Sequence, residues 1–220
     1  LIYGLGKSGI SSFNFLKGRN QVFLFDDNKN LKFNRKYKNS FIHLQQIKKF
    51  DFDIVLLSPG IDINNCKLSN YLKCNLKIIY TDLDVFYSFY GNKCITITGT
   101  NGKSTTCQLL FDVLKEQKYD VKLAGNIGYP ILSIKNIKRK TIFVIEASSY
   151  QLEYSQLFRS KYAAILNISP DHLERHGTIK KYVSAKFKLL KNQKKNSIAL
   201  VNKYDKYIQD KIITHDYNSR

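Results

Sequence analysis

The sequence predicts an α/β protein built from two consecutive units, each with a mostly parallel sheet covered by helices. Two observations support this. Short apolar runs alternate with helix-like segments along the chain, and two of these runs lead directly into glycine-rich turns, at residues 4–9 and 99–105. Such alternation is typical of parallel sheets with helices on their faces. A length of 220 residues with 43% hydrophobic residues allows one or two cores of this kind.

The first unit opens with the apolar run 1–3, a glycine turn and a helix-like segment. The apolar residues of that segment recur close to one helical face, and they are Ile10, Phe13, Phe15 and Leu16. Further buried strands are expected at residues 21–25, 53–57 and 77–80.

The glycine turn of this unit has the spacing Gly4-x-Gly6-x-x-Gly9, and Asp26 follows the next strand. An acidic residue about 20 residues after such a turn is typical of Rossmann-like dinucleotide-binding domains. The spacing alone leaves NAD or FAD binding open, and with it an oxidoreductase or a regulatory nucleotide-binding domain. We therefore expect a nucleotide ligand in a Rossmann-like first unit.

The second unit begins with the β-rich run 94–98, which enters the second glycine loop and then a helix-like stretch. Later strands are expected at residues 141–145, 162–168 and 197–201, and a helix is expected at residues 178–190. The boundary between the units falls between Tyr80 and Lys93. We divide the chain into residues 1–84 and residues 85–220.

The second glycine loop carries the strongest chemical signal in the sequence. It consists of Gly99, Thr100, Asn101, Gly102, Lys103, Ser104 and Thr105. A loop between a strand and a helix offers backbone N–H groups and the positive helix end to phosphate groups. Lys103 would contact the β- and γ-phosphates, and the Ser104 hydroxyl would bind Mg²⁺. Ile97 stands where the common P-loop has its first glycine, so this is a shortened P-loop-type mononucleotide site.

The shortened loop resembles the ATP loop of the Mur ligase family, whose relatives include folylpolyglutamate synthases. Three further segments resemble the family branch that adds D-glutamate to UDP-N-acetylmuramoyl-L-alanine, at residues 125–128, 146–153 and 167–177. The resemblance covers essentially the whole chain. It implies a Rossmann-like UDP-substrate domain and a truncated central ATPase domain, with the family's amino-acid-binding C-terminal domain absent. Turnover by these 220 residues alone is therefore not expected.

The resemblance also implies the roles of individual residues. The catalytic set is Lys103, Glu146, His172 and Lys186, and the ligands of two Mg²⁺ ions are Ser104, Glu146, His172 and Lys186. Lys186 is expected to be carbamylated, and nearby cations would favour the neutral amine that carbamylation requires. Glu146 also follows an apolar run, so its carboxylate is expected at the carboxyl edge of the sheet.

Substrate contacts are implied at both ends of the UDP-linked substrate. The residues that match the uracil contacts are Lys7, Ser8 and Asp26. The candidate contacts to the muramoyl-alanine end are Asn126, Ser148 and Gln151. The implied activity is an ATP-dependent acid–amino-acid ligation through an acyl phosphate, in the synthesis of peptidoglycan precursors. Another amino-acid-adding Mur ligase and a folylpolyglutamate synthase are the alternatives within this chemistry.

The amino-acid composition indicates which binding partners and which cellular compartment to expect. The net charge is +19, from 36 Lys and Arg against 17 Asp and Glu, but the lysines are scattered and no nucleic-acid-binding motif is present. No apolar run approaches the roughly 20 residues of a membrane span. The four cysteines have no C-x-x-C spacing, which favours reduced thiols. We expect a cytoplasmic monomer that binds small molecules, with no nucleic-acid or membrane partner.

Overall fold

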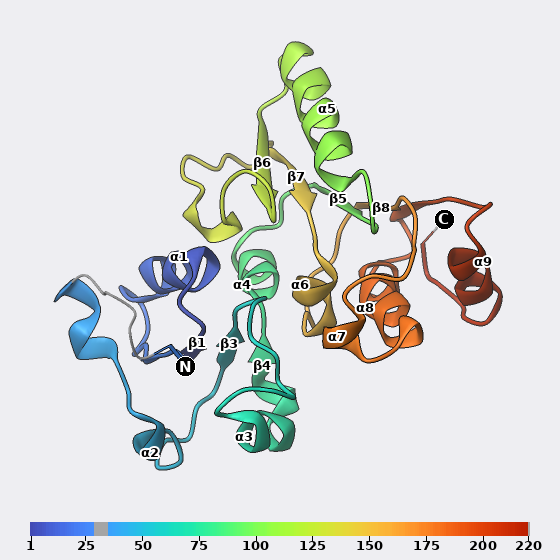
Figure 1. Ribbon diagram of the computed structural model, residues 1–220. Coiled ribbons are helices and arrows are strands. Elements are labelled where there is room, and N and C mark those ends of the chain that lie inside the picture. The colour runs from blue at the N-terminus through green and yellow to red at the C-terminus, as the bar shows by residue number, and fades with distance from the viewer. Residues whose placement is uncertain (29–34, 220) are drawn as a thin grey trace.

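The computed structural model describes residues 1–28 and 35–219. It contains a four-stranded and a five-stranded sheet, and every strand pair in both is parallel. Helices surround the two sheets (Figure 1). The α/β prediction is therefore confirmed. None of the helices within the described residues combines the length and hydropathy that a membrane span requires.

The first sheet has the strand order β2-β1-β3-β4. Its strands are β1 (Ile2–Tyr3), β2 (Leu24–Phe25), β3 (Val55–Leu57) and β4 (Ile79–Tyr80). The helices of this half are α1 (Lys7–Leu16), α2 (Leu44–Ile47) and α3 (Ser69–Cys74), with short 3₁₀ segments η1 (Arg35–Ser40) and η2 (Leu76–Ile78). The strand expected at 77–80 begins late because η2 takes up its first residues.

The second sheet has the order β6-β7-β5-β8-β9, with β5 at its centre. Its strands are β5 (Cys94–Thr98), β6 (Val121–Gly125), β7 (Ile142–Glu146), β8 (Tyr162–Ile165) and β9 (Ile198–Val201). Its helices are α5 (Lys103–Glu116), α6 (Ser149–Glu153), α7 (Leu173–His176), α8 (Ile179–Lys191) and α9 (Lys206–Ile213), and η3 (Ile131–Ser133) is a 3₁₀ turn. Strand β6 was not predicted, because Lys122 and Gly125 interrupt its apolar pattern at the sheet edge.

This strand order determines where the glycine loop lies. The chain passes from β5 to the outer strand β6, returns to β7, and then crosses β5 to reach β8 on the other side. The loop after β5 therefore lies between the ends of β7 and β8. In open parallel sheets, ligands bind at the carboxyl ends of the strands where the strand order reverses. The sequence places the loop 99–105 at this point.

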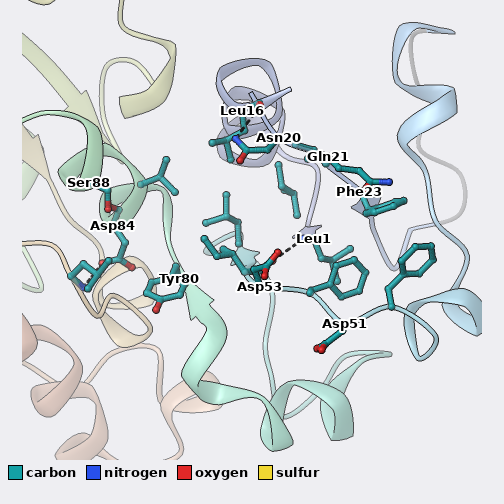
Figure 2. A pocket seen from close by; sticks show the side chains of 18 of the residues that line it. Leu1, Leu16, Asn20, Gln21, Phe23, Asp51, Asp53, Tyr80, Asp84 and Ser88 are labelled. Atoms are coloured by element: carbon teal, nitrogen blue, oxygen red, sulfur yellow. Dashed lines mark hydrogen bonds between the residues drawn. The ribbon is translucent and has the colours of Figure 1, made fainter. Parts of the chain in front are cut away.

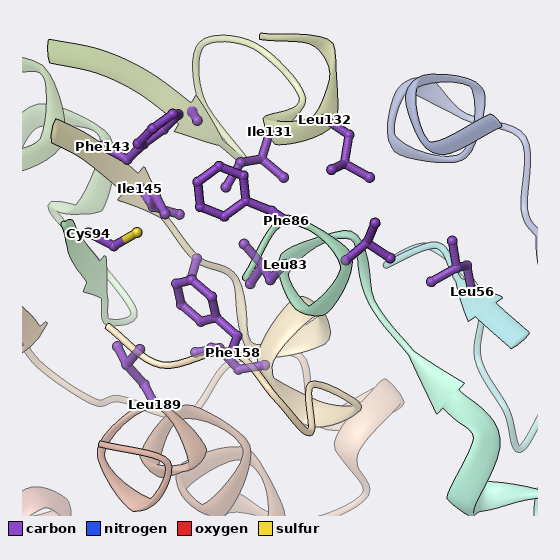
Figure 3. Packing of buried hydrophobic residues seen from close by; sticks show 14 of the residues in the cluster. Leu56, Leu83, Phe86, Cys94, Ile131, Leu132, Phe143, Ile145, Phe158 and Leu189 are labelled. Atoms are coloured by element: carbon purple, nitrogen blue, oxygen red, sulfur yellow. The ribbon is translucent and has the colours of Figure 1, made fainter. Parts of the chain in front are cut away.

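Helix α4 (Asp82–Phe89) lies between the two sheets (Figure 1). Its Leu83 and Phe86 are fully buried in one hydrophobic cluster that includes Leu56 of the first sheet and Phe143 of the second. Figure 3 shows these side chains with those of neighbouring residues. The helix was not predicted, because acidic residues alternate with its apolar ones. The domain boundary between residues 84 and 85 stays a prediction. Helix α4 spans these residues, and its buried side chains belong to a core that is continuous between the two sheets.

A buried carboxylate fixes α4 to the second half. Asp84 Oδ1 accepts hydrogen bonds from the Ser155 hydroxyl at 2.8 Å and from the backbone N–H groups of residues 156–158 at 2.7 to 3.0 Å. Its Oδ2 accepts the Thr81 N–H at 2.8 Å and so caps the start of α4. Asp84 is 1% exposed. This one side chain thus holds the segment that leads from α6 into β8.

Replacing Asp84 with Ala should lower the free energy of unfolding by about 3 kcal/mol or more, because several buried donors would lose their acceptor. Asp84→Asn keeps one carbonyl oxygen and should cost less. Urea denaturation measures both changes. Asp112→Ala, on the exposed face of α5, is the matched control and should change stability by less than about 0.5 kcal/mol. Equal effects of Asp84→Ala and Asp112→Ala would contradict this role.

Candidate functional site

The glycine loop turns sharply from β5 into α5. Gly102 has φ 79°, a left-handed conformation that glycine adopts readily, and the helix begins at the next residue. The first N–H groups of a helix have no partner within it, and they carry its positive partial charge. The Lys103 amine donates to the Thr100 carbonyl at 2.7 Å and so lies against the loop. These donors converge at the exposed end of α5, as a phosphate site requires.

Asn167, which follows β8, holds the loop from the side. Its carbonyl accepts the Thr100 N–H at 2.9 Å, and its Oδ1 accepts the Asn101 N–H at 2.9 Å. Its Nδ2 donates to the Asn101 carbonyl at 3.1 Å. The Thr100 hydroxyl adds a contact to the Tyr182 hydroxyl at 3.1 Å. The first half of the loop is thereby fixed in place, while Gly102 and Ser104 stay exposed.

Glu146, the last residue of β7, lies beside the loop and is fully buried. Its Oε2 accepts the Ser104 hydroxyl at 2.7 Å, and its Oε1 accepts the Asn126 amide at 2.8 Å. Three of the residues assigned to metal or substrate binding, Ser104, Asn126 and Glu146, thus meet at one carboxylate. Gly125 allows this approach: a Cβ there would lie 2.2 Å from the Glu146 carbonyl oxygen, at φ 104°.

Lys186 of α8 reaches the other side of the loop. It is 1% exposed, and its amine donates to the Gly99 carbonyl at 2.7 Å. The amine also lies 4.5 Å from the centre of the Tyr182 ring. Burial, aided by the positive charge of Lys103, lowers the pKa of Lys186 to about 7. A neutral amine is therefore accessible at this lysine near neutral pH.

His172 precedes α7 and has φ 52°, a conformation that residues with side chains rarely adopt. Its ring lies 5.0 Å from the Tyr150 ring and 6.4 Å from the Tyr182 ring. The two ring nitrogens lie 3.4 Å from Asp171 and 3.7 Å from Glu174. The His172 ring thus lies near Tyr182, whose hydroxyl contacts Thr100 of the glycine loop. Its imidazole faces the carboxylates of Asp171 and Glu174 in its own segment.

The residues expected to contact the uridine end lie at the first glycine turn. Lys7 and Ser8 begin α1, and Asp26 follows β2. Asp26 accepts the Leu5 N–H at 2.6 Å and the Asn28 N–H at 2.8 Å. The carboxylate is thereby held against the glycine turn at the carboxyl edge of the first sheet.

Ser148 and Gln151 lie at the start of α6. Ser148 caps α6, and its backbone N–H and hydroxyl donate to Gln151 Oε1 at 3.2 and 3.3 Å. Asp82, at the start of α4, has a pKa raised by burial, and hydrogen bonds from Ser8 and Gln151 partly oppose this shift. Ser8 of the first turn and Gln151 of α6 therefore both lie near the Asp82 carboxylate.

The donor set near the loop suits one Mg²⁺ ion. Carboxylate and hydroxyl oxygens are the ligands that this hard cation prefers, and Ser104 and Glu146 present one of each at hydrogen-bonding distance. Unmodified Lys186 is a donor and not a ligand, so it fits a metal site only as its carbamate. Within the described part of the chain, no three His, Cys, Asp or Glu side chains gather into a cation site.

A cavity of about 560 Å³ lies elsewhere, at the amino ends of the first sheet's strands. Leu1, Phe23, Asp53 and Tyr80 are among its lining residues, as Figure 2 shows. Ligands of parallel sheets bind at the opposite, carboxyl edge. This cavity is therefore separate from both glycine turns.

Sequence reasoning missed several residues that organise these sites. Asn167 and Arg175 lie within the segment 167–177 that carried the family resemblance, but nothing in the residue pattern assigned them a partner. Their roles depend on contacts across the fold. All four cysteines lie in the described residues and are unpaired there: Cys94 and Cys107 are buried, Cys66 is half-buried and Cys74 is exposed.

Comparison with known proteins identifies the family. The Mur ligase middle domain matches residues 97–218. A UDP-N-acetylmuramoylalanine–D-glutamate ligase of Rickettsia bellii is 37% identical over 206 residues, which cover 91% of this chain and 45% of the relative. The ligase of the same name from Lachnoclostridium phytofermentans is 36% identical over 95% of this chain and 48% of its own length. The chain spans about half the length of these curated relatives.

Solved structures agree at the level of the fold. A UDP-N-acetylmuramate:L-alanyl-γ-D-glutamyl-meso-diaminopimelate ligase from Neisseria meningitides has a TM-score of 0.60 at 16% identity, over 97% of this chain and 74% of that chain. A murein peptide ligase from Psychrobacter arcticus has a TM-score of 0.55 at 14% identity, over 99% of this chain and 51% of that chain. The sequence matches and the shared fold lead to one conclusion: this chain belongs to the Mur ligase family.

Proposed function

We propose that the chain is part of an ATP-dependent ligase that adds D-glutamate to UDP-N-acetylmuramoyl-L-alanine, in peptidoglycan precursor synthesis. One observation carries the ATP part of this proposal: the Ser104–Glu146 hydrogen bond sets a hydroxyl and a carboxylate side by side at the start of helix α5, next to the glycine loop. The donor and acceptor substrates are proposed from the names of relatives that match 91% and 95% of the chain.

The first chemical step would join two anions. A carboxylate oxygen of the alanyl end attacks the γ-phosphorus of ATP, the bond to the β-phosphate oxygen breaks, and ADP leaves. Lys103 and the N–H groups at the start of α5 would hold the phosphates and offset the repulsion. The Thr100 carbonyl already accepts a hydrogen bond from the Lys103 amine, which keeps this cation close to the reacting groups.

In the second step, the amine of D-glutamate attacks the carbonyl carbon of the acyl phosphate. The tetrahedral intermediate then releases inorganic phosphate, and the amine loses a proton as the amide forms. Water must be excluded while the acyl phosphate exists. Asn126 would contact the alanyl end, and its amide is already held at 2.8 Å from the Glu146 carboxylate.

Two Mg²⁺ ions would complete the proposed chemistry, with Ser104, Glu146, His172 and a carbamate on Lys186 as their ligands. When bound, such ions neutralise phosphate charge. Lys186 suits carbamylation because it is buried among loop carbonyls and next to Lys103, which disfavours its protonated form. The enzyme is proposed to act in the cytoplasm as a monomer.

A ligand panel separates this function from the alternatives. Thermal stability of the chain should rise with ATP–Mg²⁺ and with UDP-N-acetylmuramoyl-L-alanine, because ligands that bind only the folded state stabilise it. NAD and DNA should leave it unchanged. Stabilisation by NAD alone would favour an oxidoreductase or regulatory domain, and steeply salt-dependent DNA binding would favour a nucleic-acid-binding protein.

Lys103→Ala should weaken ATP–Mg²⁺ binding by about 10- to 100-fold, because it removes a charge-assisted contact to phosphate. Binding of UDP-N-acetylmuramoyl-L-alanine should change little. Isothermal titration measures both affinities. Lys115→Ala, in the last turn of the same helix, is the control and should bind ATP–Mg²⁺ like the unmodified chain. ATP affinity that survives in Lys103→Ala would show that the loop is not the phosphate site.

Lys186 should carry a carbamate in the presence of bicarbonate. Carbon NMR with isotope-labelled bicarbonate should show a protein carbamate signal that grows as the pH rises through about 7, the pKa of this amine. The neutral amine is the reactive form, so the signal should fade below that pH. Lys186→Arg should remove the signal, and Lys180→Arg, at the exposed start of α8, should keep it. A signal that persists in Lys186→Arg would assign the carbamate elsewhere.

A further inference from the structure

The proposed substrate has to reach from one sheet to the other. Its nucleotide end belongs at the first glycine turn, and its carboxylate end belongs at the loop 99–105. A ligand held at both ends binds tightly only if the two half-sites of the protein already lie at the correct distance from each other. If the protein has to rearrange to reach that distance, the free energy of the rearrangement lowers the affinity. The contacts that join the two halves of the chain are therefore candidates for control of substrate binding.

Arg175 of α7 makes such a contact. Its Nη2 donates to the Ile61 carbonyl at 2.6 Å, and its Nε lies 3.6 Å from Asp62 Oδ1. The Arg175 side chain is only 8% exposed. Ile61 and Asp62 belong to the segment after β3, so a buried cation of the second half binds the backbone and a carboxylate of the first half.

The segment after β3 in turn supports the first glycine turn. The Ser58 hydroxyl donates to the Gly4 carbonyl at 2.6 Å. Gly4 lies so close that a Cβ on it would stand 2.8 Å from Ile61 Cγ1 and 2.8 Å from Ser58 Cβ. A displacement of Ile61 would therefore also displace the backbone of the first glycine turn at Gly4.

On its other side, Arg175 contacts helix α6, which packs against the ring of His172. Its guanidinium lies 5.0 Å from the centre of the Tyr150 ring, and the Tyr150 ring lies 5.0 Å from the His172 ring. Arg175 Nη2 is also 3.8 Å from Glu153 Oε2, at the end of α6. The guanidinium is thus fixed by α6 and by the ring next to His172.

We propose that Arg175 is a positioning residue that sets the separation between the two halves of the substrate site. It acts on ligands with a nucleoside diphosphate at one end and a carboxylate at the other, and this proposal rests on the function proposed above. The planar guanidinium can contact the Ile61 carbonyl, the Asp62 carboxylate and the Tyr150 face together. A lysine ammonium cannot reproduce this arrangement.

The test compares three ligands in Arg175→Ala and Arg175→Lys: UDP, ADP–Mg²⁺ and UDP-N-acetylmuramoyl-L-alanine. UDP reports the first half-site and ADP–Mg²⁺ the second, and both should bind within about twofold of the unmodified chain. The full substrate should bind about tenfold or more weakly to the Ala variant, since misplacement of one end costs that much or more. The Lys variant should fall in between. Arg159→Ala, at an exposed arginine, is the control and should change none of the three.

Several results would overturn the proposal. One is an equal loss for UDP and for the full substrate, which would make Arg175 a contact of the first half-site alone. A parallel loss for all three ligands in both variants would assign it a general structural role. If Arg175→Ala does not fold, the Lys variant decides the question by the same comparison. Failure of the unmodified chain to bind UDP-N-acetylmuramoyl-L-alanine or ADP–Mg²⁺ would instead reject the proposed function itself.

Discussion

The candidate site depends on one buried carboxylate, Glu146. Burying a charged group costs free energy unless hydrogen bonds within the protein replace those it made to water. Here Ser104 and Asn126 each donate a hydrogen bond to one oxygen of the Glu146 carboxylate. This requirement constrains its neighbours: β6 must end in a residue without a side chain, and the first turn of α5 must carry a hydroxyl that reaches Glu146. The central strand β5 brings these parts together, because its carboxyl end lies between β7 and β8.

The two halves of the chain are joined more firmly than a linker would allow. Helix α4 contributes Leu83 and Phe86 to a core shared by both sheets, and Asp84 holds the segment before β8. Arg175 adds a polar link, through its hydrogen bond to the Ile61 carbonyl. A long substrate that contacts both turns would need such a fixed spacing, so the architecture and the proposed function are consistent with each other.

The sequence predicted the parts of this fold that local patterns encode. Strand β5 was placed at its observed residues, because its apolar run leads into an unmistakable glycine loop. Strand β6 and helix α4 were missed, since Lys122 and Gly125 in one and the acidic residues of the other break the apolar period. Glu146 and Lys186 were assigned by resemblance. Asn167, Asp84 and Arg175 escaped notice because their partners are distant in sequence and only the folded chain brings them together.

The central claim is that Glu146 and Ser104 together hold the metal that accompanies a bound nucleotide. Its most direct test is the ADP affinity of the chain with and without Mg²⁺, in the unmodified protein and in Glu146→Gln, with Glu116→Gln at the exposed end of α5 as control. Mg²⁺ should strengthen ADP binding in the unmodified chain and the control, but not in Glu146→Gln, whose metal-free affinity should be retained. The same Mg²⁺ enhancement in all three proteins would contradict the account.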